Sequence, residues 1–205
     1  MDILALLNWT LPELQRILPE PMERLTIVSA GAPMWRGGLS APASLFIHAD
    51  RPLISENATS TLLHEVMHTA LGIRAKDEYD WIVEGLAEFY SIELLRRGQA
   101  ISEYRYVAAL EDQVKWSEKA KSLCGHASGG PRTALAVTVF ASLDAEIRSR
   151  TSGDASVDDL LRELVLADER ADAELLRALV AKLTGRESSV LRADRLSGCV
   201  LGDGQ

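Results

Sequence analysis

The chain has 205 residues, of which 47% are hydrophobic and 25% are charged, a composition typical of globular proteins with a real core. It holds 22 Lys and Arg against 30 Asp and Glu, a net charge of -8 without any basic stripe, which argues against a nucleic-acid or anionic-membrane partner. No run of about 18 apolar residues occurs, so membrane insertion is not expected.

The N-terminus and the cysteines leave the compartment open. Residues 1–9 lack a basic segment and a small-residue cleavage site, so we expect them to belong to the fold and not to a signal peptide. The protein would then be cytoplasmic, or periplasmic or secreted if a leader has been removed. Cys124 and Cys199 are either two separate buried thiols or one bridge between the C-terminal tail and a mid-chain loop, which would need an oxidising compartment.

The first part of the chain predicts one helix and two short strands. Residues 8–18 have apolar side chains at near-helical spacing and end at a Pro-Glu-Pro break. Residues 24–30 and 44–49 are short and rich in β-branched or aromatic side chains, which favours strands. Between them, residues 31–42 are rich in Gly, Pro, Ala and Ser, which predicts a loop.

From residue 58 onward the pattern is helical nearly to the end. The predicted helices span residues 59–71, 80–97, 102–121, 131–150, 156–168 and 172–183. Their ends fit known signals: Ser156 and Asp159 have capping-box spacing, and Pro131 stands where a first helical residue is tolerated.

Together these elements predict a helix-dominated α+β fold. We expect a single domain over residues 1–205. In it, a β element and the helices of a functional site occupy about residues 1–121, and a helical lobe occupies about residues 122–205.

The strongest chemical signal is the motif His64-Glu65-Val66-Met67-His68. On a helix, two residues four apart lie on one face, so both imidazoles can bind one ion. Glu65 is rotated by about 100° from His64, which lets its carboxylate act as a general base on metal-activated water. The flanking positions are apolar nearly all round and predict a buried helix, where imidazoles and a carboxylate need partners. Chance matches to this motif also occur, and such a segment would be only a core helix.

The next helix offers a third ligand. Glu84 and Glu88 lie on one face of the predicted helix over residues 80–97. Gly85 and Ala87 are small, so we expect this helix to approach the histidine helix closely. Catalytic zinc sites usually have three protein ligands and one open position, and Glu84 is the candidate third ligand. Glu88 is predicted to orient His64 or His68 as a carboxylate partner, with a plain surface residue as the alternative.

The motif, followed by the segment W-x-x-E-G-L-A-E-F-Y at residues 81–90, resembles the gluzincin metallopeptidases. It is most similar to the M61 family of glycyl aminopeptidases and more distantly to the M1 aminopeptidases. The similarity extends loosely over residues 29–185, including Gly-Gly-Leu at residues 37–39. It implies a thermolysin-like zincin catalytic domain, one Zn²⁺ held by His64, His68 and Glu84, and hydrolysis of a peptide bond near a free N-terminus.

Two features depart from this family. Its members carry a large N-terminal β domain and often a C-terminal PDZ domain, and neither is found in these 205 residues. They also have a Tyr near the start of a later helix that can stabilise the oxyanion, whereas residues 124–132 contain no Tyr. His126 or Arg132 can supply the donor that the chemistry needs, or each is a plain loop or helix-start residue. Tyr104 and Tyr106 are expected to pack a helix, and His48 to be a structural or rim residue.

The expected function is zinc-dependent, aminopeptidase-like hydrolysis of a peptide bond. Glu65 would take a proton from the activated water and deliver it to the leaving amine. We expect the strand over residues 44–49 to bind an extended peptide at the cleft edge, with Gly37 and Gly38 allowing close approach.

Two alternatives stay open: a peptidase-like module that holds zinc and binds peptides without turnover, and a helical domain without a metal. The substrate side chain, exopeptidase or endopeptidase action, and the oligomeric state are not predicted.

Overall fold

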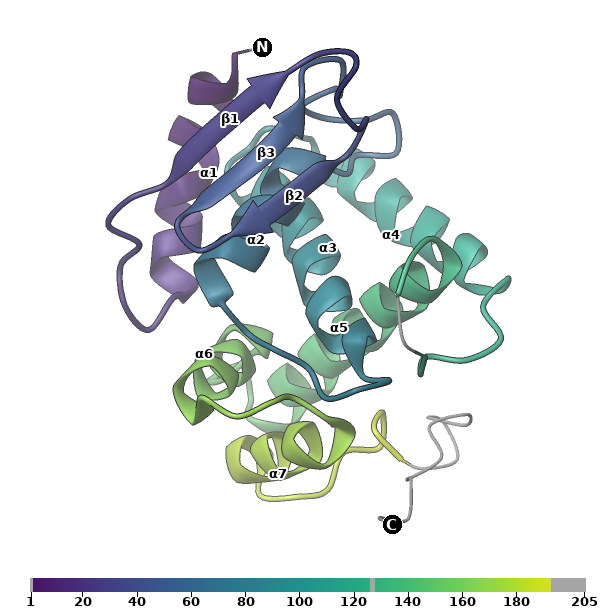
Figure 1. Cartoon of the computed structure of the whole chain (residues 1–205). Coiled ribbons are helices and arrows are strands. Elements are labelled where there is room, and N and C mark those ends of the chain that lie inside the picture. The colour runs from purple at the N-terminus through teal and green to yellow at the C-terminus, as the bar shows by residue number, and fades with distance from the viewer. Residues whose placement is uncertain (1, 126–127, 193–205) are drawn as a thin grey trace. The chain divides into compact units, whose positions relative to one another are not determined.

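The computed structural model describes residues 2–125 and 128–192. These residues form seven helices and one three-stranded sheet (Figure 1). Among them, no helix is long and apolar enough to cross a bilayer. The predicted helix-dominated α+β class is confirmed.

The chain divides into two compact units. Unit 1 comprises Met1–Gly72 and Leu86–Asp112, and unit 2 comprises Ile73–Gly85 and Gln113–Gln205. Helix α3 (Asp80–Arg97) is continuous across this division.

Unit 1 contains the sheet, which consists of β1 (Thr26–Ala30), β2 (Gly38–Ala41) and β3 (Ser44–His48) in the order β1-β3-β2. β1 runs parallel to β3 and β2 runs antiparallel to it. Two predictions were wrong here. The strand over residues 44–49 is the central strand and not a free edge, and the predicted loop over residues 31–42 contains β2. Its small side chains give no strand pattern, and pairing with β3 imposes the extended backbone.

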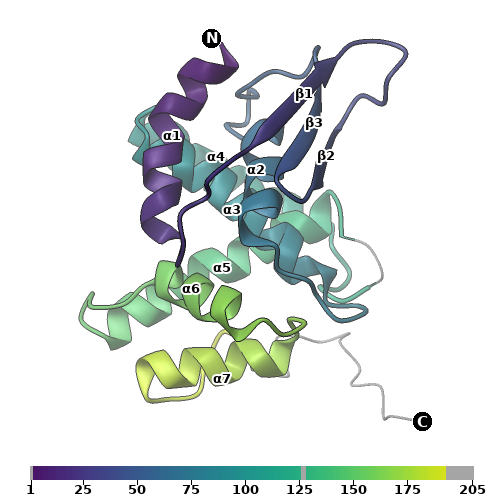
Figure 2. The same ribbon diagram turned by 60° about the vertical axis from the view of Figure 1, so that its left-hand side comes forward.

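The two faces of the sheet differ in environment. Leu45 and Ile47 of β3 are buried, and α2 (Thr61–Leu71) packs against β2 and β3. Figures 1 and 2 show α2 on one side of the three strands. Because successive side chains of a strand point to opposite faces, Phe46 points away from the buried face.

The helices of unit 1 begin and end at recognisable caps. α1 (Ile3–Ile17) starts earlier than predicted because Asp2 caps it, and it tolerates Pro12 in its interior. α2 begins after Ser60, whose side chain accepts a hydrogen bond from the backbone N–H of Leu63, and ends at Gly72 with φ 59°. Glycine accepts this left-handed conformation without steric cost. α4 (Glu103–Ser117) is shorter than predicted.

Unit 2 is built on α5 (Pro131–Arg150), α6 (Val157–Ala167) and α7 (Ala173–Thr184), which pack on one another. The predicted capping box of Ser156 and Asp159 is confirmed. The segment before α3 also belongs to this unit, and within it Ala75 pairs with Ala171 in an isolated β-bridge.

Gly85 does not serve the helix approach that the sequence predicted. A Cβ atom at this position would lie 2.5 Å from Cβ of Ala136 and 3.1 Å from the Phe140 ring, both on α5. The neighbouring Trp81 also contacts Phe140, with ring centroids 6.0 Å apart. The missing side chain therefore lets α3 pack closely on α5.

Cys124 is disulfide-bonded. Cys199, the other member of the predicted alternative, lies outside the described residues.

Candidate metal centre

Helix α2 holds the two histidines of the motif at half-buried positions. Five apolar residues of this helix are buried, namely Leu62, Leu63, Val66, Met67 and Leu71. This burial fixes the rotation of the helix, so that the side chains of His64 and His68 lie one turn apart on one face. Glu65, the residue between them in the motif, is only 8% exposed.

The two imidazoles face each other through their Nε2 atoms, which lie 3.0 Å apart. Their ring centroids are 4.7 Å apart and the rings are nearly perpendicular, at 73°. The other ring nitrogen of His64, Nδ1, lies 3.0 Å from Oε2 of Glu88. A carboxylate can only accept, so Nδ1 of His64 carries the proton and its Nε2 presents a lone pair toward His68.

Glu84 and Glu88 come from α3, one helical turn apart. The ligand atoms of His64, His68 and Glu84 all lie within 4.8 Å of one another. Glu88 is bound instead to the far nitrogen of His64, and the two side chains are 18% and 15% exposed. Helix α3 thus places the carboxylate of Glu84 beside the two imidazoles and that of Glu88 at the opposite side of the His64 ring.

This donor set fits a zinc ion. Zinc takes imidazole nitrogen and carboxylate oxygen at about 2.0–2.2 Å in a tetrahedral arrangement, which sets neighbouring ligand atoms roughly 3.3 Å apart. The separation of 3.0 Å between the two Nε2 atoms and the 4.8 Å limit over all three residues are close to this geometry. The hydrogen bond from His64 to Glu88 fixes the tautomer that a metal-binding imidazole needs.

Gly38 is what gives Glu65 its space. A Cβ atom at Gly38 would lie 2.6 Å from Cγ and 2.8 Å from Oε1 of Glu65. The sequence predicted that Gly37 and Gly38 leave room for a substrate. In the structure the space beside Gly38 is filled by the Glu65 side chain, so the glycine lets this carboxylate lie directly against β2.

Thr69 is a positioning residue that the sequence did not reveal. Its Oγ1 lies 2.9 Å from the carbonyl oxygen of Glu65 and 3.3 Å from that of Ser44. The hydroxyl therefore ties the backbone of α2 at Glu65 to the start of β3. A threonine four residues after Glu65 on a helix was the available signal, since such hydroxyls bond to the carbonyl four residues back.

Further along α3, Glu93 forms a different kind of cluster. Its carboxylate accepts from Arg96 at 2.8 Å and Arg97 at 2.9 Å, and also from the hydroxyl of Tyr106. Burial raises the pKa of Glu93, but these hydrogen bonds and the two guanidinium charges outweigh it, so the pKa lies below its ordinary value. Arg96 also lies over the Tyr106 ring, 4.9 Å from its centroid. The predicted packing role of Tyr106 is confirmed.

The other residues singled out in the sequence have different surroundings. Tyr104 is 86% exposed, so its predicted packing role was wrong; it lies on the outer face of α4. His48 is buried at 1% exposure, and its Nδ1 accepts from the backbone N–H of Asp50 at 3.2 Å, as a structural residue would.

Arg132 and His126 were the candidate oxyanion donors. Nε of Arg132 donates to the carbonyl oxygen of Ser122 at 3.2 Å, and its guanidinium lies against Gly125, where a Cβ atom would come within 2.4 Å of Nη1. These contacts hold the turn before α5. His126 lies outside the described residues, so the oxyanion role stays a prediction for both.

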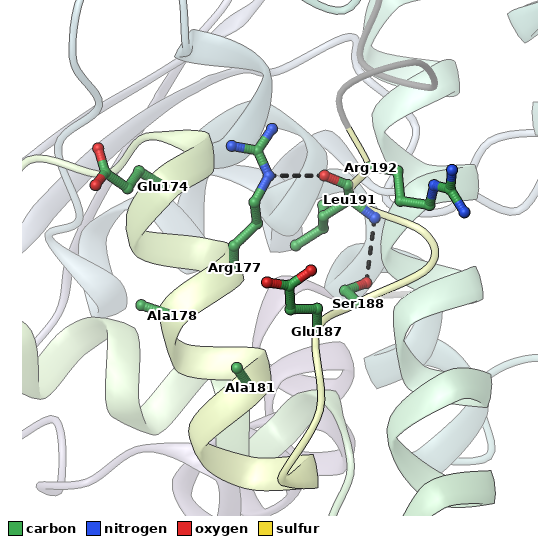
Figure 3. Close-up of a pocket in the computed structure, with 8 residues that line it drawn as sticks. All are labelled: Glu174, Arg177, Ala178, Ala181, Glu187, Ser188, Leu191 and Arg192. Carbon is green, nitrogen blue, oxygen red and sulfur yellow. Dashed lines mark hydrogen bonds between the residues drawn. The ribbon is translucent and has the colours of Figure 1, made fainter.

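Unit 2 contains a separate pocket of about 650 Å³ beside α7. Figure 3 shows Arg177 on α7 donating to the carbonyl oxygen of Leu191, at 2.8 Å. Glu174, Glu187 and Arg192 complete its charged lining. The lining mixes both signs of charge and contains no histidine or cysteine, and we assign no chemistry to it.

Comparison with known proteins gives one fold relationship. No family model and no curated protein matches the chain. A solved structure, an aminopeptidase N family protein from Idiomarina loihiensis, superimposes with a TM-score of 0.63 at 17% sequence identity. The two chains share a fold. The match covers 80% of this chain and 36% of the aminopeptidase N family protein. The described fold is therefore similar to about a third of that larger protein, and at this identity the likeness concerns the fold alone.

Proposed function

We propose that this protein hydrolyses peptide bonds with one zinc ion bound by His64, His68 and Glu84. The observation that carries the proposal is the convergence of three ligand atoms within 4.8 Å, with Glu88 on the far nitrogen of His64. Zinc bound there would supply a Lewis acid that polarises a carbonyl and lowers the pKa of a water. The shared fold with an aminopeptidase N family protein supports an aminopeptidase-like activity.

Glu65 is the proposed general base. It follows His64 on α2, and its carboxylate lies against β2 at Gly38. In this role it takes a proton from the attacking water and delivers it to the leaving amine nitrogen. Its low exposure limits competition from bulk water, and the Thr69 hydroxyl holds the backbone that carries it.

The free edge of β2 is the proposed docking edge for substrate. In an antiparallel pair, opposite residues alternate between those that exchange hydrogen bonds and those that do not. The N–H of His48 donates to the carbonyl of Gly37 at 3.0 Å, and the register continues to Leu39 opposite Phe46. The peptide groups of Gly38 and Ser40 therefore point away from β3. An extended substrate that pairs with them would lie beside Glu65.

A second candidate is a peptidase-like module that holds zinc and binds peptides without turnover. The contacts of Arg132 with Ser122 and Gly125 favour it, because they engage this candidate oxyanion donor in the turn before α5. An oxyanion donor is worth about 10²–10³ in rate, so a site without one would bind peptides and cleave them slowly.

The substitution Glu65→Gln tests the mechanism. We expect zinc-loaded Glu65→Gln protein to keep its metal and to lose at least about 100-fold in kcat, measured on a panel of aminoacyl and short-peptide substrates. Glu118→Gln, at an exposed position, is the matched control and should keep full activity. Retained turnover in Glu65→Gln would refute Glu65 as the base, and peptide binding without turnover in the unaltered protein would favour the second candidate.

A further inference from the structure

The face of the sheet opposite α2 carries an exposed apolar row. Val28 of β1 and Leu39 of β2 both lie opposite Phe46 of the central strand. Val28 is 52% exposed and Leu39 is 58% exposed. Residues directly opposite in neighbouring strands point to the same face, so the row runs across all three strands and ends at the free edge of β2.

Trp35 extends this row along β2. A Cβ atom at Gly37 would lie 2.1 Å from the Trp35 indole, so the indole occupies the space where a side chain of residue 37 would project. Gly37 and Leu39 are two residues apart and project to one face. Trp35 nevertheless remains 61% exposed. The indole and Leu39 therefore lie next to each other on the outward face, at the start of the edge strand.

A peptide that pairs with β2 would have its side chains sorted by this register. Its residue opposite Gly38 would point to the inward face, where Gly38 contacts Glu65. Its two neighbours, opposite Gly37 and Leu39, would point outward. One of these would lie against the Trp35 indole and the other against Leu39.

We propose that Trp35 and Leu39 form an apolar subsite that selects peptides with a large apolar side chain next to the residue lying over Glu65. This inference rests on the proposed function.

The charge of the segment agrees with an apolar subsite. Residues 31–48 contain no Asp or Glu, and Arg36 is their one Lys or Arg. Arg36 lies 3.6 Å from Asp50, and both side chains are exposed. A lysine or arginine side chain of the substrate would find no carboxylate on this segment, whereas Phe or Leu would bury apolar area against the indole.

The test compares peptides with Phe or Ala at each position flanking the cleaved residue in turn. We expect the unaltered protein to prefer Phe at one flanking position by about tenfold in kcat/KM, chiefly through KM. Trp35→Ala or Leu39→Ala should bring this ratio close to one, because each removes part of the apolar surface that the Phe side chain would contact. Val28→Ala is the matched control, because Val28 is similarly exposed but lies on β1, which the central strand separates from β2. It should keep the preference.

The outcomes separate the subsite from the proposed function. If the unaltered protein cleaves peptides without an apolar preference, or if both Trp35→Ala and Leu39→Ala keep it, the subsite is refuted and the proposed function stands. If nothing is cleaved, the proposed function fails. The subsite is then tested by the Kd values of the same peptides for zinc-loaded Glu65→Gln protein and for Glu65→Gln protein that also carries Trp35→Ala. If the ratio of the Kd values for the Phe and Ala peptides is equal in the two proteins, the subsite is overturned.

Discussion

Helix α3 carries two glutamates, Glu88 and Glu93, whose hydrogen-bond partners differ. The carboxylate of Glu93 accepts from two guanidinium groups and one phenol of its own unit. The carboxylate of Glu88 instead accepts from the imidazole of His64, whose other nitrogen faces His68. Glu93 therefore has cationic partners from the chain itself. Glu88 instead supports His64, one of the three candidate metal ligands.

One helix thus carries one glutamate that affects stability and another that affects metal binding. Removing a buried carboxylate that is held by arginines destabilises the fold, because it leaves their charges uncompensated. Such a carboxylate also has little capacity left for a ligand. A carboxylate that fixes a histidine tautomer adds little to folding but raises the affinity of the histidine for a cation. Substitutions at the two glutamates should therefore affect different measurements.

The largest effect on folding is expected from Glu93→Gln. Removing this charge takes a buried carboxylate away from two guanidinium groups, and we expect a loss of about 3 kcal/mol in the free energy of unfolding. Denaturant unfolding of the metal-free protein measures it, with Glu118→Gln as a control expected to stay within about 0.5 kcal/mol. Zinc affinity should not change. A weaker zinc affinity without lost stability would reverse the proposed separation.

A smaller effect, on zinc affinity and not on stability, is expected from Glu88→Gln. The amide keeps the size of the side chain but removes the charge that supports His64, so zinc affinity should fall by roughly 10–100-fold. Competition with a chelator of known affinity measures this change, and the metal-free protein should unfold with a free energy within about 1 kcal/mol of the unaltered one. An unchanged zinc affinity would assign Glu88 to structure alone.

The smallest effect is the acid dependence of stability. The folded-state pKa of Glu93 lies below its ordinary value of 4.5, so the folded state binds this proton less readily than the unfolded state. Its contribution is present above the unfolded pKa and is lost as the pH falls from there through the folded pKa. Unfolding of metal-free protein should therefore become easier below about pH 4.5, and less steeply in Glu93→Gln. Parallel pH profiles for the two proteins would contradict this assignment.

The helices and the residues of the candidate site were predictable from local patterns. The limits of α3 and α5 follow from apolar spacing and from Pro131 at a helix start. The spacing of the histidines on α2 requires them to share a face. Because Glu84 and Glu88 are also one turn apart, the sequence could indicate that both carboxylates lie on the helix face that would meet the histidines.

The strands β1 and β3 were predicted from the sequence, but β2, the strand order and the role of the glycines were not predictable, because they depend on contacts between distant segments. β2 is made of Gly38, Leu39, Ser40 and Ala41, and only its register with β3 makes it a strand. Gly85 was assigned to the wrong neighbour, since its contact with α5 lies about 50 residues away in the chain. Close packing between distant elements has no local signature.

Zinc content of the purified protein and of Glu84→Gln tests whether His64, His68 and Glu84 form a zinc site. We expect one zinc per chain in the unaltered protein, held by His64, His68 and Glu84, and a zinc affinity reduced by at least about tenfold in Glu84→Gln. Elemental analysis after exhaustive dialysis measures the stoichiometry. A protein that holds no stoichiometric zinc, or a Glu84→Gln variant that holds it as tightly as the unaltered chain, would contradict the account.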